Sequence, residues 1–341
     1  MKILLYFENQ NAMSISGIGR ARRHQMMALE SQGIEYTLDP FDDYDILHIN
    51  TYLQNSESII KKARKEGKPV IYHAHSTKED FRDSFVFANA ISPFFNKYLV
   101  DHYKMADEII TPTPYSKKLL ESYGIDLPIT AISNGIDLNR FYPDEEKVRA
   151  FYNYFGLSKE DKIVFSVGLL FDRKGIKDFF EVARKLPQYK FIWFGTTPEL
   201  TITADVKKAI KERPFNVIMP GYVKGAVIEG CYQAADCFFF PSYEETEGIV
   251  VLEALASRAN VLVRDIGVFD PWLTDKVNCY KGHNNDEFAD LVQKIVEKKI
   301  PCLKEEGYKV AQSKSIEEIG KQLKEVYERV YRKAYSNEKI A

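Results

Sequence analysis

The chain has 341 residues, of which 28% are charged and 45% are hydrophobic. A single hydrophobic core seldom grows beyond about 250–300 residues, so this length predicts two domains. The composition is globular and argues against a collagen-like or wholly disordered chain. With 47 Lys and Arg against 49 Asp and Glu the net charge is -2. A general nucleic-acid-binding protein would be more basic, so we expect no nucleic-acid partner.

No segment of the sequence predicts secretion or membrane spanning. The most suggestive uncharged run, residues 84–96, is interrupted by Asn89, Pro93 and Asn96, whereas a spanning helix needs about 20 mostly apolar residues. The start MKILLYFENQ lacks the basic and apolar regions of a secretory signal. The four cysteines form no CxxC pair and are too few for a disulfide framework. We therefore expect a cytoplasmic protein with reduced cysteines.

In the first half of the chain, short apolar runs alternate with helix-like stretches. A loop over residues 8–16 leads into a helix with Gly17 and Gly19 at its entrance. Strands are predicted at residues 3–7, 34–38, 46–49, 70–72, 108–111 and 129–132. Strands that alternate with helices, such as residues 56–65, predict a parallel, doubly wound sheet. We expect a Rossmann-like domain over residues 1–150.

A second alternating series predicts another Rossmann-like domain, over residues 151–314. After Asn134-Gly135 the sequence becomes polar and aromatic, and we interpret this stretch as a bridge. Strands are predicted at residues 163–167, 191–194, 216–219, 237–240 and 261–263, with helices at 177–185, 249–258 and 286–298. Residues 315–341 should form an amphipathic helix that packs back toward the first domain. Two such α/β domains are expected to face each other across a cleft, with ligands at the strands' carboxyl ends.

The most informative segment is PSYEETEGIVVLEALASR, residues 241–258. Glu245 and Glu253 stand eight positions apart, and Gly248 directly precedes an apolar helix. The first amides of a helix lack intrahelical partners and lie at the positive end of its dipole, so this turn suits an anion. The two carboxylates could bind hydroxyls at two places along a ligand. On spacing alone, a surface Glu pair beside an ordinary helix start is favoured.

The pattern around this segment resembles the retaining family 4 glycosyltransferases of the GT-B fold. Their Pro-Ser-x-x-Glu-x-x-Gly-x-x-x-x-Glu-Ala segment carries an E-x7-E motif. The matching residues are Pro241, Ser242, Glu245, Gly248, Glu253 and Ala254. Further matches are Asn134-Gly135-Ile136-Asp137, Val167-Gly168 with Lys174-Gly175, and Gly221-Tyr222-Val223. The resemblance covers nearly the whole chain and implies the GT-B fold and transfer of a hexose from a nucleotide sugar.

The resemblance also implies roles for individual residues. Glu253 would bind the ribose hydroxyls, Glu245 the transferred sugar near its anomeric centre, and Lys174 the diphosphate. The residues expected to bind the donor are Gly17, Gly19, Arg173, Tyr222, Val223, Gly248, Ile249, Val250 and Glu253. Leu169 departs from the family, which usually has Arg there, and Arg173 could supply that charge. Glu247 and Arg258 depart as well, at positions where the family has an aromatic residue and often Gly.

Two local patterns suggest rival chemistries. Gly17-Ile18-Gly19 imitates a dinucleotide fingerprint, but a loop separates it from the strand and Arg22 occupies the third glycine position. Taken alone, an ordinary loop is the better interpretation of these glycines. Asp43-Tyr44-Asp45 imitates the Asp-x-Asp metal site of the other major glycosyltransferase fold, but it leads into an apolar run and is interpreted as a strand entrance. We expect no catalytic metal and no cofactor besides the UDP-sugar donor.

His73 and His75 follow a predicted strand and point the same way if the strand continues. They could form a metal pair, but no third ligand stands out. The family often has a His that lines the donor sugar here, and His75 fits that role, while His73 is expected to pack or to support it. The expected reacting centre is therefore Glu245, Lys174 and His75.

Basic and aromatic residues of the first half suggest a surface for a lipid acceptor. These residues are Arg20, Arg23, Lys61, Lys65, Phe94, Phe95 and Tyr98, within clusters that also include His24, Phe87 and Tyr103. Basic residues beside apolar ones suit an anionic membrane, at about 1 kcal/mol per Lys or Arg near its surface. Solvated helix faces with core aromatics explain the same residues equally well.

The segments SGIGRARRHQ, HINTY, HAHSTKEDFRDSF and ITPTPYSKKLLESYGI look like bacterial glucosyl-diacylglycerol glycosyltransferases, of the galactosyl-glucosyl-diacylglycerol synthase type. This resemblance implies a retaining, metal-independent hexosyltransferase. It would move galactose or glucose from a UDP-sugar to monoglucosyl-diacylglycerol, peripherally on the inner face of the cell membrane. Alternatives are a polysaccharide or wall-polymer acceptor, or a non-catalytic relative that binds nucleotide sugars.

Overall fold

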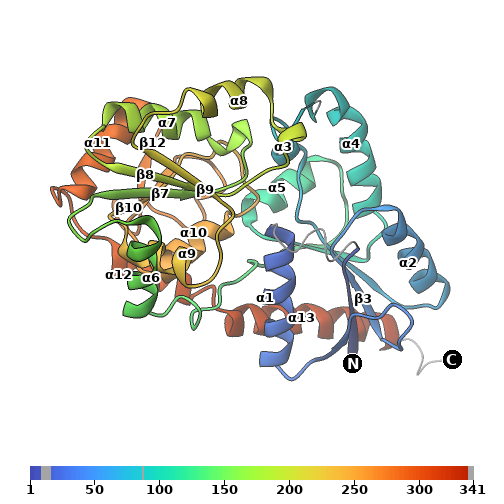
Figure 1. The fold of residues 1–341 in the computed structure, drawn as a ribbon. Coiled ribbons are helices and arrows are strands. Elements are labelled where there is room, and N and C mark those ends of the chain that lie inside the picture. The colour runs from blue at the N-terminus through green and yellow to red at the C-terminus, as the bar shows by residue number, and fades with distance from the viewer. Residues whose placement is uncertain (9–16, 87, 337–341) are drawn as a thin grey trace. The chain divides into compact units, whose positions relative to one another are not determined.

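The computed structural model describes residues 1–8, 17–86 and 88–336. Its contacts divide the chain into two compact units (Figure 1). Unit 1 consists of Met1–Lys78, Ile91–Asp137 and Lys314–Ala341, and unit 2 of Glu79–Ala90 and Leu138–Ser313. Each unit is built around its own six-stranded sheet.

The sheet of unit 1 is parallel throughout, in the order β2-β1-β3-β4-β5-β6. Its strands are β1 (Lys2–Tyr6), β2 (Glu35–Thr37), β3 (Ile46–Ile49), β4 (Val70–His73), β5 (Glu108–Thr111) and β6 (Ile129–Ala131). From β1 the chain adds β2 on one side and β3 to β6 on the other. The carboxyl ends of β1 and β3 therefore form the topological switch point, where open α/β sheets bind ligands.

Alternate strand residues of unit 1 pack on opposite faces of the sheet. Ile46 and Ile71 pack against α1 (Gly17–Ser31) and α13 (Ile316–Tyr335), which lie side by side in Figure 1. Leu47 belongs to the core on the other face. That face is covered by α2 (Gln54–Lys65), α4 (Ala88–Tyr103) and α5 (Pro114–Ser122); a short helix, α3 (Lys78–Phe81), precedes α4. Helices on both faces explain why the strands are apolar without alternation.

The sheet of unit 2 repeats this plan in the order β12-β11-β10-β7-β8-β9. Its strands are β7 (Ile163–Val167), β8 (Lys190–Phe194), β9 (Val217–Gly221), β10 (Cys237–Phe240), β11 (Val261–Arg264) and β12 (Tyr280–Gly282). All paired strands are again parallel. The switch point of this sheet lies between β7 and β10, so their carboxyl ends are where a ligand is expected.

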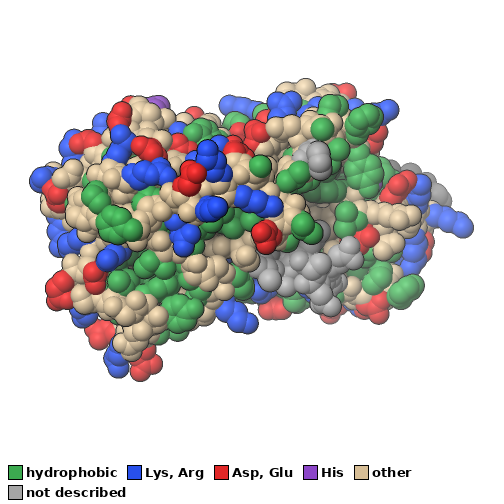
Figure 2. All heavy atoms as spheres, turned by 45° about the horizontal axis from the view of Figure 1, so that its top comes forward, with side chains coloured by type: hydrophobic (Ala, Val, Ile, Leu, Met, Phe, Trp, Pro, Cys, Tyr) green, Lys and Arg blue, Asp and Glu red, His purple; other side chains and the backbone are tan. Residues whose placement is uncertain are grey.

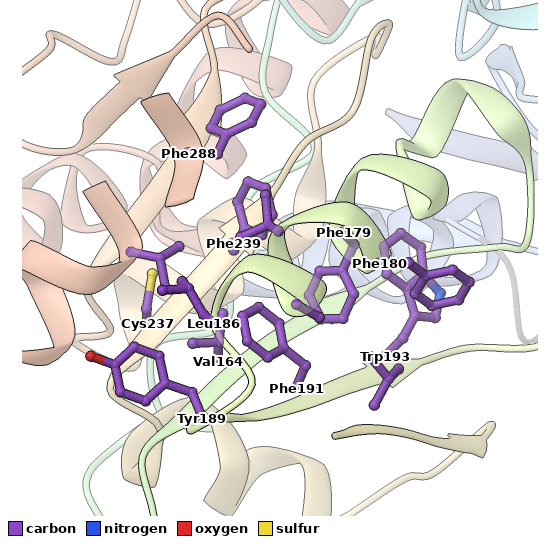
Figure 3. Close-up of a cluster of buried hydrophobic side chains, with 14 of the residues drawn as sticks. Val164, Phe179, Phe180, Leu186, Tyr189, Phe191, Trp193, Cys237, Phe239 and Phe288 are labelled. Atoms are coloured by element: carbon purple, nitrogen blue, oxygen red, sulfur yellow. The ribbon is translucent and has the colours of Figure 1, made fainter. Parts of the chain in front are cut away.

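The core of unit 2 is rich in aromatic rings (Figure 3). Phe179 packs edge-on against Trp193, with ring centroids 5.2 Å apart, and stacks with Phe239 at 5.9 Å. This face of the sheet is covered by α7 (Ile176–Lys185), α8 (Ala204–Lys211) and α11 (Asn285–Val296). Phe155 and Tyr232 pack against the other face. They belong to α6 (Glu145–Phe155) and α9 (Ala226–Ala234); α10 (Ile249–Ala256) packs on α12 (Lys304–Gln312).

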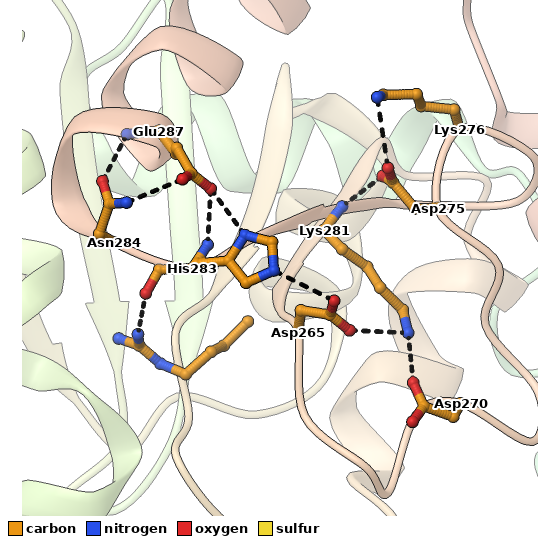
Figure 4. A network of polar contacts seen from close by, with 9 residues as sticks. Asp265, Asp270, Asp275, Lys276, Lys281, His283, Asn284 and Glu287 are labelled. Carbon is orange, nitrogen blue, oxygen red and sulfur yellow. Dashed lines mark hydrogen bonds and ion pairs between the residues drawn. The ribbon is translucent and has the colours of Figure 1, made fainter.

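Polar contacts fasten the segment after β11 to β12 and α11 (Figure 4). Lys281 Nζ lies 3.1 Å from Asp265 and 2.8 Å from Asp270, and its side chain is only 8% exposed. His283 Nδ1 lies 2.8 Å from Glu287. The partners of Lys281 and both members of the His283–Glu287 pair are exposed, so each pair contributes little individually, but together the pairs fix the path of the loop.

The two parallel sheets with helices on their faces confirm the predicted fold class. Each predicted strand is present, with ends shifted by no more than two residues, while β12 was not predicted. The stretch interpreted as a bridge contains α6. Asp144 begins this helix by accepting hydrogen bonds from two amides, and Gly156 ends it in a left-handed conformation. Both signals are visible in the sequence, but the many polar and aromatic residues between them obscured the helix.

Candidate active site

A buried ion pair lies at the switch point of unit 2. Lys174 belongs to the short 3-10 helix η1 (Asp172–Lys174) that follows β7, and Glu245 follows β10. The Lys174 ammonium directly contacts the Glu245 carboxylate, and the two side chains are 13% and 9% exposed. Ser242 Oγ donates a hydrogen bond of 2.7 Å to Glu245 Oε1. The two sequence segments on which the expected reacting centre depends are therefore in contact.

Burial and charge act in opposite directions on this pair. Burial lowers the pKa of Lys174, and the Glu245 carboxylate offsets part of that effect. Burial alone would raise the pKa of Glu245, but the Lys174 and Arg173 cations hold it below its ordinary value. The Glu245 carboxylate is therefore ionised at neutral pH, and its charge favours the protonated form of Lys174. An ammonium has three donor hydrogens, so Lys174 can bind an oxygen anion while it keeps Glu245.

Arg173 connects the site to the segment between β4 and α4. Its Nε donates to Ser84 Oγ at 2.8 Å, and Nη1 donates to the Glu244 carbonyl at 3.0 Å. The guanidinium still acts electrostatically on Lys174 and Glu245. Leu169 is 36% exposed. Arg173 thus has its side chain fixed beside the pair, whereas the position that departs from the family presents an apolar surface.

Gly175 allows the segment after β7 to approach the end of β10. Its φ is +73°, and a Cβ atom there would lie 2.3 Å from the Pro241 carbonyl oxygen. Such a contact would displace the backbone. The absence of a side chain at Gly175 therefore lets Lys174 reach Glu245.

Helix α10 and its N-cap contain four of the residues expected to bind the donor: Gly248, Ile249, Val250 and Glu253. Gly248, at φ +87°, is its N-cap and has no side chain to bond the first amides, and Ile249 and Val250 are partly exposed. Glu253 is only 3% exposed and accepts a hydrogen bond of 2.8 Å from the Tyr232 hydroxyl. Tyr222 and Val223 follow β9, the first exposed and the second partly so.

In unit 1 the predicted site residues lie near the ends of β1 and β4. Helix α1 begins at Gly17 and includes Gly19; the loop before it, residues 9–16, lies outside the described residues. His75 follows β4, and its Nε2 lies 2.8 Å from Asn50 Oδ1. His73 is buried and stacks on His75, with ring centroids 4.2 Å apart.

The side chains that surround these imidazoles were not predicted from the sequence. His48 stacks on His73 at 5.4 Å, and Tyr327 of α13 contacts His48. Gln25 of α1 bonds both Asn50 and His73. A signal was present, because the histidine of HINTY stands two positions before an asparagine, with the same spacing as His73 and His75 on the neighbouring strand.

The expected acceptor surface is only partly a surface. Arg23, Lys61 and Lys65 are exposed and Arg20 is partly exposed, while Phe94 of α4 is 81% exposed. Tyr98 is 41% exposed and its hydroxyl donates to the Tyr52 carbonyl; Phe95 instead packs against Tyr52, and Tyr103 is buried. His24 is buried rather than on the basic face, because its Nδ1 lies 3.2 Å from the Asn134 carbonyl. Phe87 lies outside the described residues.

Basic and acidic side chains are interspersed with hydrophobic ones over the face drawn in Figure 2. Asp43-Tyr44-Asp45 is a strand entrance, as interpreted: Asp45 accepts a hydrogen bond from the Lys2 amide, and Tyr44 is buried.

Within the described ranges, no helix is long and apolar enough to cross a membrane. In those same ranges no three His, Cys, Asp or Glu side chains are grouped as a metal site.

Substitution of Gly175 should be more damaging than substitution of a glycine with the same backbone conformation. Gly156 has φ 63° and ψ 32° against 73° and 28° for Gly175, and a Cβ there meets nothing within 4 Å. Gly156→Ala should therefore lower the free energy of unfolding by about 1 kcal/mol, the strain of a left-handed alanine. Gly175→Ala should lower it by several times as much, as measured by urea denaturation. Equal losses would contradict the close approach to Pro241.

Stability should fall as the pH falls from 7 to 5 because of the buried imidazoles. Burial lowers the pKa of His48 and of His75 to about 3, and that of His73 well below 6.5, and the side chains bonded to them are uncharged. Below about pH 6.5 the unfolded chain binds protons that the folded chain does not. Each imidazole therefore removes up to about 1.4 kcal/mol of unfolding free energy per pH unit.

The measurement is urea denaturation at several pH values. His48→Gln should reduce the change in unfolding free energy per pH unit. His283→Gln is a matched control, because Glu287 raises the pKa of His283, so that its stabilising effect is present at low pH and lost as the pH rises. In His283→Gln the unfolding free energy should fall between pH 7 and 5 at least as steeply as in the wild type. A stability that does not change between pH 7 and 5 would contradict three imidazoles that stay neutral in the folded protein.

Comparisons with known proteins identify the family of this chain. Residues 151–326 match the family described as glycosyl transferases group 1, and residues 13–140 match glycosyltransferase family 4. The processive diacylglycerol alpha-glucosyltransferase of Acholeplasma laidlawii is 53% identical over 331 residues, 97% of this chain and 98% of that protein. The alpha-galactosylglucosyldiacylglycerol synthase of Streptococcus pneumoniae is 26% identical over 305 residues, 88% of this chain and 79% of that protein.

Solved structures show the same fold at low sequence identity. The sucrose-phosphate synthase of Thermosynechococcus elongatus superposes with a TM-score of 0.80 at 17% identity, covering 97% of this chain and 99% of that one. The Anabaena protein Alr3699/HepE, in complex with UDP and glucose, superposes with a TM-score of 0.77 at 17% identity, covering 96% and 100%. Together with the two family matches and the 53% identical relative, these findings show that the chain belongs to the family 4 glycosyltransferases.

Proposed function

We propose that this protein transfers a hexose from a UDP-sugar to a diacylglycerol lipid, with retention of anomeric configuration and without a metal ion. The observation that carries the proposal is the buried contact between Lys174 and Glu245 at the switch point of unit 2. Such a pair offers a cation to a diphosphate and a carboxylate to sugar hydroxyls. The 53% identical relative, named as a diacylglycerol glucosyltransferase, supports a lipid acceptor and favours glucose over galactose.

In this mechanism the bond between the anomeric carbon and the diphosphate oxygen breaks, and negative charge develops on that oxygen. The Lys174 ammonium and the first amides of α10 stabilise this charge. Glu245 binds hydroxyls of the transferred sugar, and Glu253, already oriented by Tyr232, binds the ribose. The acceptor hydroxyl attacks from the side that the diphosphate leaves, and the leaving phosphate takes its proton.

The remaining donor contacts are assigned by position. Tyr222 and Val223 follow β9 and present backbone groups to the base, while Gly17 and Gly19 at the start of α1 allow close approach of the ligand. Arg173 adds positive potential beside the diphosphate. His75 lines the transferred sugar. UDP-sugar is the donor substrate, and no further cofactor is required.

The lipid acceptor implies peripheral binding to the inner face of the cell membrane. Phe94 is 81% exposed on α4, where a large apolar side chain can enter the interface of a bilayer. Lys61 and Lys65 are exposed on α2 and would be attracted to anionic headgroups.

Neutralising either member of the ion pair should abolish most activity. Lys174→Met and Glu245→Gln should each lower kcat at least about 100-fold, because each removes a group that stabilises the transition state. Each variant also leaves one buried charge without its partner and should lose about 3–5 kcal/mol of unfolding free energy. Full activity in either variant would remove that residue from the mechanism.

The double variant separates stability from catalysis. Lys174→Met with Glu245→Gln contains no unpaired charge, so urea denaturation should show much of the lost stability restored. Activity should stay at the level of the single variants. Recovery of activity together with stability would show that the pair is structural.

The substrates can be determined with purified protein and defined vesicles. Anionic vesicles containing diacylglycerol, monoglucosyl-diacylglycerol or neither lipid are incubated with UDP-glucose or UDP-galactose, and mass spectrometry identifies the lipid products. We expect hexosyl lipids from UDP-glucose with both acceptors, and less product with zwitterionic vesicles. If UDP binds in calorimetry but no lipid product forms, the proposed lipid acceptor is wrong. If UDP does not bind, the proposed UDP-sugar donor is wrong.

A further inference from the structure

Arg264 is a buried charged residue of unit 2 that the proposed mechanism does not use. It is the last residue of β11, and it is only 7% exposed. Arginine is almost never buried to this extent unless its charge and its N–H groups have partners. The partners of Arg264 therefore indicate what its burial does for the protein.

The Arg264 guanidinium binds the backbone at two places. Its Nε donates a hydrogen bond of 3.0 Å to the carbonyl of Pro241, the residue that follows β10. Its Nη1 donates a hydrogen bond of 3.0 Å to the carbonyl of His283, between β12 and α11. Pro241 is itself buried, and the carbonyl of a buried residue needs such a donor. Arg264 thus connects the end of β10 to the segment before α11.

Tyr243 and Asp178 contact the same guanidinium. The guanidinium carbon lies 3.8 Å from the centre of the Tyr243 ring, within the range of a cation–π interaction. The Tyr243 hydroxyl donates to Asp178 Oδ1 at 3.1 Å, and Arg264 Nη2 lies 3.4 Å from the same oxygen. The side chain of Asp178 is only 14% exposed, so this ion pair is partly shielded from solvent. The Tyr243 ring is therefore fixed both at its face and at its hydroxyl.

Arg264 thus constrains the chain on both sides of Ser242, which contacts the ion pair of the candidate active site. Ser242 Oγ donates to Glu245 Oε1 at 2.7 Å. The amide of Tyr243 donates to the Arg173 carbonyl at 2.8 Å. These two bonds hold the loop after β10, residues 241–247, against η1.

Arg264 also acts at the close approach between η1 and β10. The Pro241 carbonyl oxygen that accepts from Arg264 Nε is the atom to which a Cβ at Gly175 would come within 2.3 Å. Within the described part of the chain, Arg264 makes no hydrogen bond or ion pair with Lys174 or Glu245. Its effect on that pair therefore passes through the loop after β10.

We propose that Arg264 is a positioning residue, which fixes the loop after β10 so that the Glu245 carboxylate is held where it binds hydroxyls of the transferred sugar. This inference rests on the proposed function, in which Glu245 has that role. A planar guanidinium suits the task, because it can donate to two carbonyls and stack on a ring at the same time. The ammonium of a lysine has no flat face and cannot make these contacts together.

Hydrogen exchange tests the positioning role without any substrate. Arg264→Lys keeps a cation beside Asp178 but loses the paired backbone bonds and the stacking. In this variant the amides of residues 242–247 should exchange faster than in the wild type, as measured by mass spectrometry of the full chain under native conditions. Unchanged exchange over these residues in the folded variant would overturn the proposal.

A second variant approaches the same contact from the solvent side. Tyr243 is 49% exposed, so its replacement disturbs the core less than replacement of Arg264. Tyr243→Leu removes the stacking and the bond to Asp178, and it should also speed exchange over residues 242–247. If neither Tyr243→Leu nor Arg264→Lys changes this exchange, the loop is held by other contacts and the proposal is wrong.

Asn216→Leu is the matched control. Asn216 is 2% exposed, and its Nδ2 lies within 3.1 Å of three backbone carbonyl oxygens, those of Ala183, Leu186 and Tyr189. Like Arg264 it is a buried side chain that connects separate backbone segments. It directly precedes β9, however, at the opposite edge of the sheet from the switch point. Asn216→Leu should lower the free energy of unfolding but leave the exchange of residues 242–247 and the activity unchanged.

Calorimetry separates the sugar contact from the rest of the donor. Wild type and Arg264→Lys are titrated with UDP and with UDP-glucose, which differ by the hexose that Glu245 is proposed to bind. The variant should bind UDP as tightly as the wild type does, and UDP-glucose about tenfold more weakly, the effect of one hydrogen bond to a charged group. Equal weakening for both ligands would indicate a general structural role and contradict the proposal. If the wild type binds no UDP, the proposed function fails, whereas the exchange experiment still tests the role of Arg264.

Discussion

The contact between Lys174 and Glu245 is the interaction on which the organisation of unit 2 around its ligand site depends. Two charges that lose their hydration remain ionised only if each has its counter-charge and further hydrogen bonds. Ser242 provides one such bond, and the Arg173 guanidinium adds positive potential. The neighbouring backbone must also come close enough for the pair to form, which explains a glycine directly after the lysine.

The two units use the same position in their sheets for different chemistry. In unit 2 the switch point carries ionised groups, suited to a diphosphate and to hydroxyls beside it. In unit 1 the side chains near the switch point are amides, which carry no charge, and imidazoles. Burial lowers the pKa of these imidazoles and keeps them neutral.

Much of this architecture could be predicted from the sequence. Mostly apolar runs of three to five residues marked the strands, since helices cover both faces of each sheet and no alternation was needed. The spacing of Glu245, Gly248 and Glu253 indicated a candidate donor site, and Lys174, predicted to belong to it, contacts Glu245. Local signals sufficed because these residues directly follow strands.

Contacts between distant segments could not be predicted. The hydrogen bonds around His48 and His73 join residues from α1, β3, β4 and α13. Nothing in the sequence around Tyr327 indicates a partner nearly 280 positions away. The aromatic stretch before Tyr103 gave no means of telling Phe94, which is exposed, from Phe95, which is packed. Helical periodicity shows which residues share a face, but only tertiary structure shows which face is covered.

The division of the chain has a consequence for modular engineering. Unit 2 includes the short segment Glu79–Ala90, which interrupts the sequence of unit 1. Ser84 of this segment accepts a hydrogen bond from Arg173 Nε. Unit 1 likewise includes the terminal helix, which follows the whole of unit 2 in sequence. A chimaera made at a single junction would therefore separate each unit from one of its own pieces. Exchange of the whole of unit 1 between relatives requires grafting of three separate stretches at once.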